Sequence, residues 1–352
     1  MKRSLLKPRR VRIVLSALLA FALVAAIAAY LGRGRIVDAV IRDRLKDDTD
    51  RAYVQDKEHI RVLLCGTGSP EVSAARAQAC TLVAAGGKLF LFDAGEGATK
   101  SLAESNVPYG ELERVFITHF HSDHFNGLGT LVNATWIWGR TEPLDIWGPV
   151  GLDKVVGGLN SAYALDHGYR RANMHHLDAS GAAADAIPTE IEFPDGTRSV
   201  RVYNQGGVTI DARLVAHDPV SPALGYVLTY RGKKVFISGD TEVRPVNLPA
   251  MQNADLVIHE AYATHLVRRA IPHMRDMGLT RDAKVAEDTI RYHADTIALA
   301  KQAQQAGVKH LVLTHLTPYP DGFVARRLFT QGMSDHYKGE LTVGSDGLVV
   351  VL

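Results

Sequence analysis

Residues 119–124 hold the densest group of potential metal ligands in this chain, and they constrain its fold more than any other feature. They read His-Phe-His-Ser-Asp-His and follow a β-branched run that we expect to form a strand. Two histidines separated by one residue on extended backbone point the same way, so His119 and His121 face one point. Asp123 and His124 turn toward a neighbouring point as a helix begins at Phe125. Because zinc takes imidazole nitrogens and carboxylate oxygens, this one segment predicts two adjacent metal positions.

Further ligands stand at the ends of other predicted strands. Strand-like runs alternate with helical stretches, which is typical of an α/β fold; the runs are 60–69, 88–97, 112–124, 208–217, 233–240 and 310–315. Four of these runs finish on or contain a ligand type, at His119, His217, Asp240 and His315. In 208–216 the even positions are apolar, so strict alternation places His217 on the face opposite the core. We expect these strand ends to meet at one site.

Composition limits the chemistry of that site. With 2 cysteines against 15 histidines, the chain cannot build a four-thiolate zinc site, and imidazole and carboxylate must supply the ligands. Cys65 ends one strand and Cys80 begins the next, so both a disulfide and two buried free thiols remain open. The 40 Lys+Arg against 38 Asp+Glu give a formal charge of +2, which indicates no overall polyanion-binding surface.

The N-terminus has the pattern of a membrane signal. Six basic residues and no acid precede the apolar run 13–31. A spanning helix needs about 20 apolar residues and a secretory signal ~7–15, so length favours an uncleaved anchor. The triplet Ala26-Ile27-Ala28 keeps a cleaved signal open. The basic flank predicts export of everything after residue 32, either tethered to the inner or plasma membrane or secreted. We therefore expect an anchor or signal over 1–31, a charged linker over 32–58 and a folded domain over 59–352.

The ordered motifs of the folded domain resemble those of metallo-β-lactamase-fold hydrolases, and among these the ribonuclease Z-like branch, which includes zinc arylsulfatases. The resemblance covers roughly residues 59 to 352 and rests on Gly66-Thr67-Gly68-Ser69-Pro70, Phe92-Asp93-Ala94-Gly95-Glu96-Gly97, residues 119–124, His217 followed by Gly225-Tyr226, Ser238-Gly239-Asp240-Thr241, His259-Glu260-Ala261, His293, and Leu313-Thr314-His315. It implies an α/β αββα sandwich, in which two β-sheets are flanked by helices.

The same resemblance implies two zinc ions with a hydroxide between them as the nucleophile. The first ion would be held by His119, His121 and His217, the second by Asp123, His124 and His315, and Asp240 would bridge the two. A physical reason supports this chemistry independently, because zinc-bound water ionises near pH 7 and paired cations stabilise both the attacking and the leaving oxygens. Asp93, Gly95 and Gly97 are expected to form only a supporting turn beneath the site.

Two further residues complete the predicted catalytic set with Asp123, which is expected to orient the hydroxide and accept a proton. The resemblance places His293 opposite the leaving group as a general acid, with Glu260 as its acidic partner. Asp295 follows closely and is expected to cap the helix that runs to Gly307. A bound anion facing this helix N-terminus would gain dipole stabilisation.

The substrate prediction is a small anionic ester, either an aryl sulfate or a phosphodiester. Arg170, Arg171, Arg268 and Arg269 are the candidate substrate-binding residues. Ribonuclease Z-type processing of tRNA precursors is the alternative. Against it, no arginine follows the final ligand in Thr317-Pro318-Tyr319-Pro320, and the insertion 158–200 has a net charge of −3, from six acidic and three basic residues, which would repel RNA. Nucleic acid is therefore disfavoured as a partner. A non-catalytic, zinc-stabilised binding domain is the alternative from another class, and the resemblance also suggests a homodimer.

Overall fold

The computed structural model describes residues 8–46, 48–174 and 182–352, which form two compact units, Met1–Thr49 and Asp50–Leu352. The first unit is a helix, α1 (Pro8–Arg44). Within the described residues, no single helix has the length and apolar composition to cross a membrane; only Leu18–Ile27 and Ala29–Arg44, bent by 44° from one another, satisfy both conditions together. The predicted single spanning helix is thus not supported. The basic residues before Pro8 lie outside the described residues.

Residues 32–58, which the sequence suggested as a charged linker, have defined structure over much of their length. Residues 32–44 continue α1, and Ala52–Gln55 form the short helix α2 of the second unit. Tyr53 is buried in the core of that unit. Because this side chain packs in the core, the residues just before 59 belong to the second unit.

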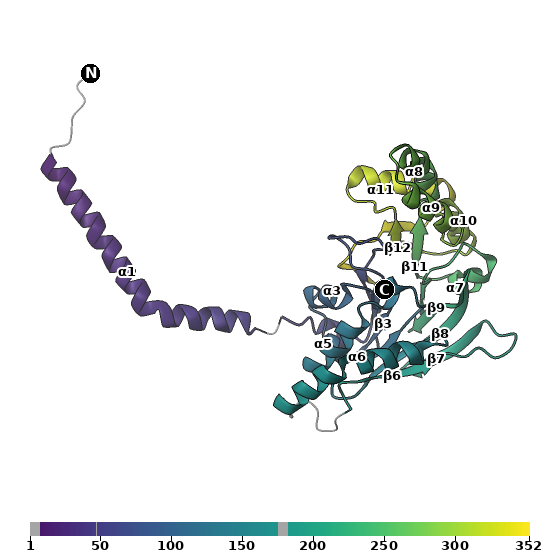
Figure 1. Ribbon diagram of the computed structural model, residues 1–352, viewed down its shortest axis with the longest axis horizontal. Helices are drawn as coiled ribbons and strands as arrows, with labels where there is room; N and C mark the ends of the chain where they lie inside the picture. Colours follow the sequence, from purple (N-terminus) through teal and green to yellow (C-terminus); the bar gives the residue numbers. More distant parts are fainter. Residues whose placement is uncertain (1–7, 47, 175–181) are drawn as a thin grey trace, which may run out of the picture. The chain divides into compact units, whose positions relative to one another are not determined.

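The second unit is built on two seven-stranded sheets (Figure 1). The first sheet has the order β14-β1-β2-β3-β4-β5-β6 and the second has the order β13-β12-β11-β10-β9-β8-β7. The strands of the first sheet are β1 (Arg61–Gly66), β2 (Cys80–Ala85), β3 (Lys88–Phe92), β4 (Leu112–Phe116), β5 (Leu144–Gly148), β6 (Ala186–Glu190) and β14 (Leu348–Val351). Those of the second are β7 (Ser199–Gln205), β8 (Val208–His217), β9 (Val220–Tyr230), β10 (Lys233–Ile237), β11 (Leu256–Tyr262), β12 (His310–Thr317) and β13 (Glu340–Val343).

Helices cover the outer faces of both sheets, and others lie at the strand ends. The helices after α2 are α3 (Ala98–Glu104), α4 (Ser122–Phe125), α5 (Leu128–Ile137), α6 (Leu152–Asn173), α7 (Leu248–Met251), α8 (Thr264–Asp276), α9 (Thr280–Thr289), α10 (Thr296–Gln305), α11 (Phe323–Phe329) and α12 (Met333–His336), with 3-10 turns at Tyr109–Glu111 and Pro245–Asn247. One apolar cluster joins the inner faces of the two sheets, around Phe92, Phe116 and Tyr226. A second packs the first sheet against α3, α5 and α6, and a third packs the other sheet against α7, α10 and α12. The predicted αββα sandwich is confirmed.

The directions of the strands place the ends that precede the predicted ligands at one edge of a sheet. In the first sheet β3, β4, β5 and β6 are parallel, and in the second β10, β11, β12 and β13 are parallel. β8 is antiparallel to β9, which is antiparallel to β10, so β8 runs in the same direction as β10. The carboxyl ends of β8, β10, β11 and β12 therefore share one edge of their sheet, which is where ligands bind in open α/β sheets.

All six predicted strands are present, but three of the four predicted strand-end ligands are displaced from the ends. β4 ends at Phe116 and β10 at Ile237, so His119 and Asp240 lie in the loops that follow. His315 lies inside β12 with a positive φ of 46°, a left-handed conformation that side chains adopt rarely. Only His217 is the last residue of its strand.

Close backbone contacts bring these loops together. A Cβ at Gly239, whose φ is 59°, would lie 2.5 Å from the carbonyl oxygen of Leu224 and 2.9 Å from Cβ of Thr118. A Cβ at Gly95 would lie 2.2 Å from the carbonyl oxygen of Asp123. Glycine is therefore required by packing against neighbouring backbone at both positions. Cys65 and Cys80 form a disulfide between β1 and β2, which resolves the pairing that the sequence left open in favour of a bridge.

Candidate metal centre

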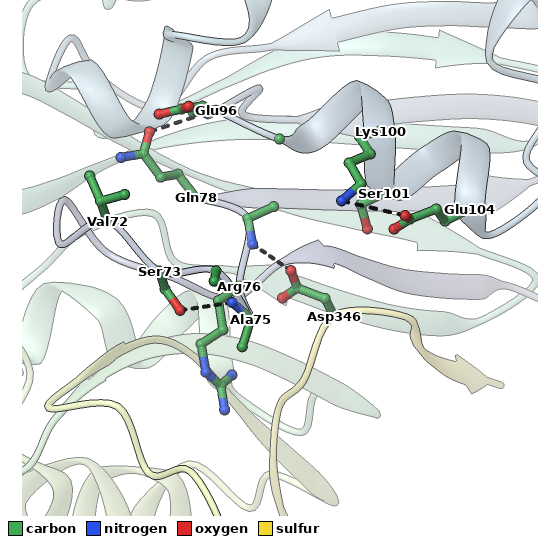
Figure 2. Close-up of a pocket in the computed structure, with 13 residues that line it drawn as sticks. Val72, Ser73, Ala75, Arg76, Gln78, Glu96, Lys100, Ser101, Glu104 and Asp346 are labelled. Carbon is green, nitrogen blue, oxygen red and sulfur yellow. Dashed lines mark hydrogen bonds and ion pairs between the residues drawn. The ribbon is translucent and has the colours of Figure 1, made fainter.

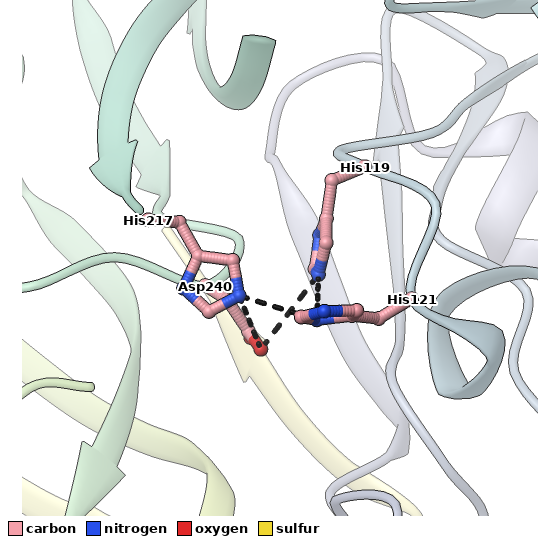
Figure 3. A group of neighbouring side chains, drawn as sticks. All are labelled: His119, His121, His217 and Asp240. Carbon is pink, nitrogen blue, oxygen red and sulfur yellow. Dashed lines mark hydrogen bonds and ion pairs between the residues drawn. The ribbon is translucent and has the colours of Figure 1, made fainter. Parts of the chain in front are cut away.

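Three histidines and one aspartate converge on a single space where the two sheets meet (Figure 3). Nε2 of His119 is 3.0 Å from Nδ1 of His121, which is 3.2 Å from Nε2 of His217. Oδ2 of Asp240 is 3.9 Å from the His119 nitrogen and 3.8 Å from the His217 nitrogen. These four residues, which we call the first ligand group, come from the first sheet and from the second.

A second ligand group, Asp123, His124 and His315, lies beside the first and contacts the same aspartate. Nε2 of His315 is 3.0 Å from Oδ2 of Asp123 and 3.4 Å from Oδ2 of Asp240. Nε2 of His124 is 3.4 Å from the other oxygen of Asp240, Oδ1. Asp240 thus faces both groups, one carboxylate oxygen toward His124 and the other toward His119, His217 and His315.

The donor atoms fit a divalent metal. Four ligands at 2.0–2.2 Å around a tetrahedral ion are separated from one another by about 3.3 Å, close to the distances within both groups. Nε2 of His124 and Oδ1 of Asp240 are buried and have no hydrogen-bond partner among the described residues. A cavity of about 20 Å³ lies against His124, Asp240 and His315. Buried polar atoms without partners are rare, so their alignment toward a common space fits a divalent cation as their partner.

Other residues orient the ligands. Oδ2 of Asp93 is 2.7 Å from Nδ1 of His124, and the same carboxylate accepts hydrogen bonds from the Thr118 backbone N–H and hydroxyl. This directs Nε2 of His124 toward the centre, as carboxylate–histidine–metal arrangements do. Nδ1 of His217 donates to the backbone carbonyl of Tyr292 at 3.0 Å, which leaves its Nε2 free to accept a metal.

Glu260 and His293 form a buried pair at the edge of the centre. Nδ1 of His293 is 3.0 Å from both carboxylate oxygens of Glu260 and 3.9 Å from Oδ2 of Asp240. The Glu260 carboxylate also accepts hydrogen bonds from the backbone N–H groups of Thr241 and Ala294. The ring of Tyr262 stacks on that of His293 at 5.6 Å. His293 also forms a third possible ligand set with Asp240 and His315, which sequence reasoning did not include.

Charges divide the two ligand groups. Burial lowers the pKa of His119 and His121, and neighbouring imidazoles lower it further. Burial opposes the positive charge on His124 and His315 as well, but the Asp240 carboxylate outweighs it and raises the pKa of both. Burial likewise lowers the pKa of His293, and Glu260 then raises it to about 9. The surroundings therefore favour the neutral form of His119 and His121 and the protonated form of His124, His315 and His293.

The predicted substrate-binding arginines lie apart from these groups on two helices. Arg170 and Arg171 are in the last turn of α6, where Nε of Arg170 pairs with Asp166 at 2.8 Å. Arg268 and Arg269 are exposed on α8. None of the four belongs to a described ligand group. The predicted cap is confirmed, since the Asp295 carboxylate accepts hydrogen bonds from the first turn of α10.

Sequence reasoning underestimated Asp93 and missed Tyr292. Asp93 was expected only to support the site, yet it contacts His124 directly and has a positive φ of 58°. Its place after a strand in an Asp-Ala-Gly motif was the available signal. Tyr292 acts through its backbone carbonyl, and its ring lies 5.3 Å from that of His217. No side-chain pattern could have revealed a carbonyl contact.

A separate cavity of about 220 Å³ is lined in part by Glu96 and Gly97, which follow Asp93 in the chain (Figure 2). Its lining includes Gln78, whose side-chain oxygen accepts a hydrogen bond from the Glu96 backbone, and Lys100 beside Glu104. Asp346 accepts a hydrogen bond from the Ala77 backbone at its wall. No residue of the ligand groups lines it, so these contacts fix the 93–97 turn and do not add ligands.

Known proteins resemble this chain over most of its second unit. The family model described as anti-Pycsar protein Apyc1 matches residues 60–317. Ribonuclease Z of Mycobacterium sp. (strain KMS) is 35% identical over 262 residues, which are 74% of this chain and 85% of that protein. Ribonuclease Z of Mycobacterium bovis (strain BCG / Pasteur 1173P2) is 31% identical over 290 residues, 82% of this chain and 96% of that protein.

Solved structures share the architecture. The metallo-beta-lactamase fold protein YhfI from Bacillus subtilis superimposes with a TM-score of 0.62 at 20% identity, covering 84% of this chain and 100% of that one. The short form of human tRNase Z superimposes with a TM-score of 0.58 at 23% identity, covering 82% and 98%. At these identities the two structures establish the fold alone.

Proposed function

Since this chain belongs both to the family of anti-Pycsar protein Apyc1 and to the ribonuclease Z-like metallo-β-lactamase-fold hydrolases, we propose that it is a zinc-dependent phosphodiesterase that cleaves RNA in the manner of its ribonuclease Z relatives. The observation that carries the proposal is the pair of ligand groups that share Asp240, with the Glu260–His293 pair beside them. This arrangement provides a cation site for a phosphate and a proton donor for its leaving oxygen in one place.

Zinc suits the donor set because imidazole nitrogens outnumber carboxylates and no thiolate is available. Two ions suit its division into two groups. When bound, such ions supply an ionised water near neutral pH and stabilise charge on the phosphate. His119, His121, His217, Asp123, His124 and His315 would hold them, with Asp240 between.

The remaining steps belong to side chains. Protonated His293 would donate its proton to the leaving oxygen, and the Glu260 carboxylate would hold the ring and stabilise its charge. The stacked Tyr262 ring would prevent the imidazole from swinging away. Asp123, 3.0 Å from His315, would orient the attacking water and accept its proton. These proposed roles are the ones that the resemblance implies for His293, Glu260 and Asp123.

The sequence alone predicted a small anionic ester as the substrate and gave ribonuclease Z-type cleavage as the alternative. The proposal adopts that alternative. The 31–35% identity to ribonuclease Z extends over most of both chains, whereas aryl sulfate hydrolysis has no comparable support. The −3 charge of 158–200 still favours a small diester as the second candidate, because no basic arm is available there to hold a tRNA.

A substrate panel tests the proposal. The full chain, loaded with zinc, is assayed at low salt against a tRNA precursor, single-stranded RNA, a bis-aryl phosphate and an aryl sulfate, with His293→Gln as the matched control. We expect RNA cleavage that falls at least about 100-fold in the variant at unchanged zinc content. Turnover of the bis-aryl phosphate alone would select the small-diester candidate, and stoichiometric zinc without any turnover would select the non-catalytic domain.

A further inference from the structure

Two helices arise from the strands that carry the site. β11 holds Glu260 and ends at Tyr262, and α8 begins at Thr264. β12 holds His315 and ends at Thr317, and α11 begins at Phe323. Because these strands are parallel, both helices start from the sheet edge on which the ligands lie. Nε2 of His265 on α8 is 3.0 Å from the carbonyl oxygen of Leu328 on α11, so the helices touch (Figure 1).

Four exposed arginines stand on these helices. We call Arg268 and Arg269 of α8 together with Arg326 and Arg327 of α11 the arginine patch. Arg268 and Arg269 follow His265 by one helical turn, on the side of α8 that meets α11. Arg326 and Arg327 lie in the last turn of α11, beside the carbonyl that His265 contacts. The four arginines therefore lie within about one helical turn of the contact between His265 and Leu328.

These arginines lack acidic partners, unlike most others in their neighbourhood. Within the described residues, no hydrogen bond or ion pair involves any side chain of the arginine patch. By contrast, Arg275 on the same helix pairs with Glu287, Arg291 pairs with Asp288 at 3.1 Å, and Arg244 pairs with Glu242 at 2.7 Å. Four unneutralised guanidinium groups on adjoining turns create a local positive field despite the near-neutral chain.

We propose that the arginine patch binds the phosphate backbone of an RNA substrate away from the bond that is cleaved. This inference rests on the proposed function, and it assigns Arg268 and Arg269 a different task from the one predicted from the sequence, which was contact with the reacting anionic group. Guanidinium groups bind phosphates with paired hydrogen bonds and release condensed counterions. A polymer whose scissile phosphate lies at Asp240 must leave the site across its rim, where α8 and α11 begin.

The surface next to the patch also suits an unpaired nucleotide. A cavity of about 620 Å³ is lined by Arg327 together with Phe323, Val324 and Leu328, and Phe323 is 78% exposed. Exposed aromatic rings beside arginines are the elements with which proteins hold single-stranded RNA, by stacking a base while cations hold its backbone. The patch thereby compensates for the acidic 158–200 segment, which offers no such contact.

Charge reversal tests the inference. The full chain is prepared with Arg268→Glu/Arg269→Glu, with Arg326→Glu/Arg327→Glu, and with Arg198→Glu/Arg213→Glu as the matched control. Arg198 is exposed and Arg213 is half-buried at the strand pair β7–β8, and neither forms an ion pair with another described residue. Binding of a fluorescent tRNA precursor is measured by anisotropy between 50 and 200 mM salt, and hydrolysis of a bis-aryl phosphate is measured in parallel. Arg→Gln versions replace any Glu variant whose melting temperature falls.

We expect each patch variant to bind the RNA at least about tenfold more weakly at 50 mM salt. The slope of log affinity against log salt should flatten by about 1 for each arginine removed. Hydrolysis of the bis-aryl phosphate should stay within about twofold of the parent, because that substrate does not reach the patch. Equal RNA affinity in parent and patch variants, or an equal loss in the Arg198/Arg213 control, would overturn the inference.

Two outcomes keep this inference separate from the proposed function. Patch-dependent RNA binding by a chain that cleaves no diester would support the patch and contradict the proposed function. Diester cleavage by a chain whose RNA affinity does not change in the patch variants would support the proposed function and contradict the inference about the patch. If the patch variants instead lose binding only to phosphatidylserine vesicles, the surface contacts a membrane and the RNA inference is wrong.

Discussion

The two ligand groups share Asp240 and lie side by side, yet they differ in charge. In the first group three imidazoles face one another, and burial with mutual repulsion lowers the pKa of His119 and His121. In the second group carboxylates surround the imidazoles, and they raise the pKa of His124 and His315. We therefore expect a cation to displace fewer protons from His119 and His121 than from His124 and His315. The two groups have similar ligands, and the difference comes from the charges around them.

Loss of the shared ligand should remove the distinction between the groups. In Asp240→Asn, both groups lose the carboxylate that they share, and several kcal/mol of charge stabilisation disappear, so phosphodiesterase activity should fall by roughly 10³-fold or more. Zinc content by elemental analysis should drop for both ions together. Retention of one tightly bound ion in this variant would mean that Asp240 serves only one group.

His293 tests whether the third set, with Asp240 and His315, holds a metal. His293→Gln should lower kcat by about 10²–10⁴-fold with zinc content unchanged, since a general acid is lost but no ligand. Loss of one zinc ion instead would make His293 a ligand.

The pH profile follows from the same residue. Glu260 raises the pKa of His293 to about 9, so the acid is protonated at neutral pH and lost as pH rises through that value. Activity should decline on the alkaline side at or below about pH 9, because bound cations repel the imidazolium. Glu260→Gln removes the stabilising carboxylate, so the decline should move to lower pH. An unshifted pH profile in Glu260→Gln would mean that Glu260 does not set the pKa of the proton donor.

Asp93 should matter for the second group alone. Asp93→Asn removes the charged partner of His124, and changes to such partners typically weaken metal binding 10–100-fold. Competition with a chromophoric chelator should show one weakened zinc and one unchanged zinc. Thr118→Ser is the matched control, because it keeps the hydroxyl that contacts Asp93 and His119 and leaves the carboxylate in place. Equal weakening of both ions would show that the groups are not independent.

The smallest effect is the pH dependence of metal loading. Because the pKa of His124 and of His315 is raised, protons compete with the second ion below those pKa values, and its apparent affinity should rise with pH by up to about tenfold per unit for each proton displaced. The first group should change less over the same range. Calorimetric titration in buffers of different ionisation enthalpy measures the number of protons released per ion. Equal release at both sites would contradict the proposed difference in charge between the two ligand groups.

Short-range patterns in the sequence identified the six strands, the Asp295 cap and the seven residues that the structure brings into its ligand groups. These features follow from neighbours in the chain, since alternation, capping and the spacing in 119–124 are local. Alternation was insufficient even within β8, where Val208, Ile210 and Ala212 are buried as expected but the pairing with β9 shifts register between Val215 and His217. That irregularity, not simple periodicity, sets the direction of His217.

Contacts between distant segments were decided by the tertiary structure alone. The carboxylate of Asp93 on His124, the Tyr292 carbonyl on His217 and the junction of α8 with α11 each join residues whose proximity no local pattern encodes. The Cys65–Cys80 bridge likewise depended on how β1 and β2 pair. The sequence determined which chemical groups are available, and packing determined their partners, because a partner's position depends on how the two sheets close against each other.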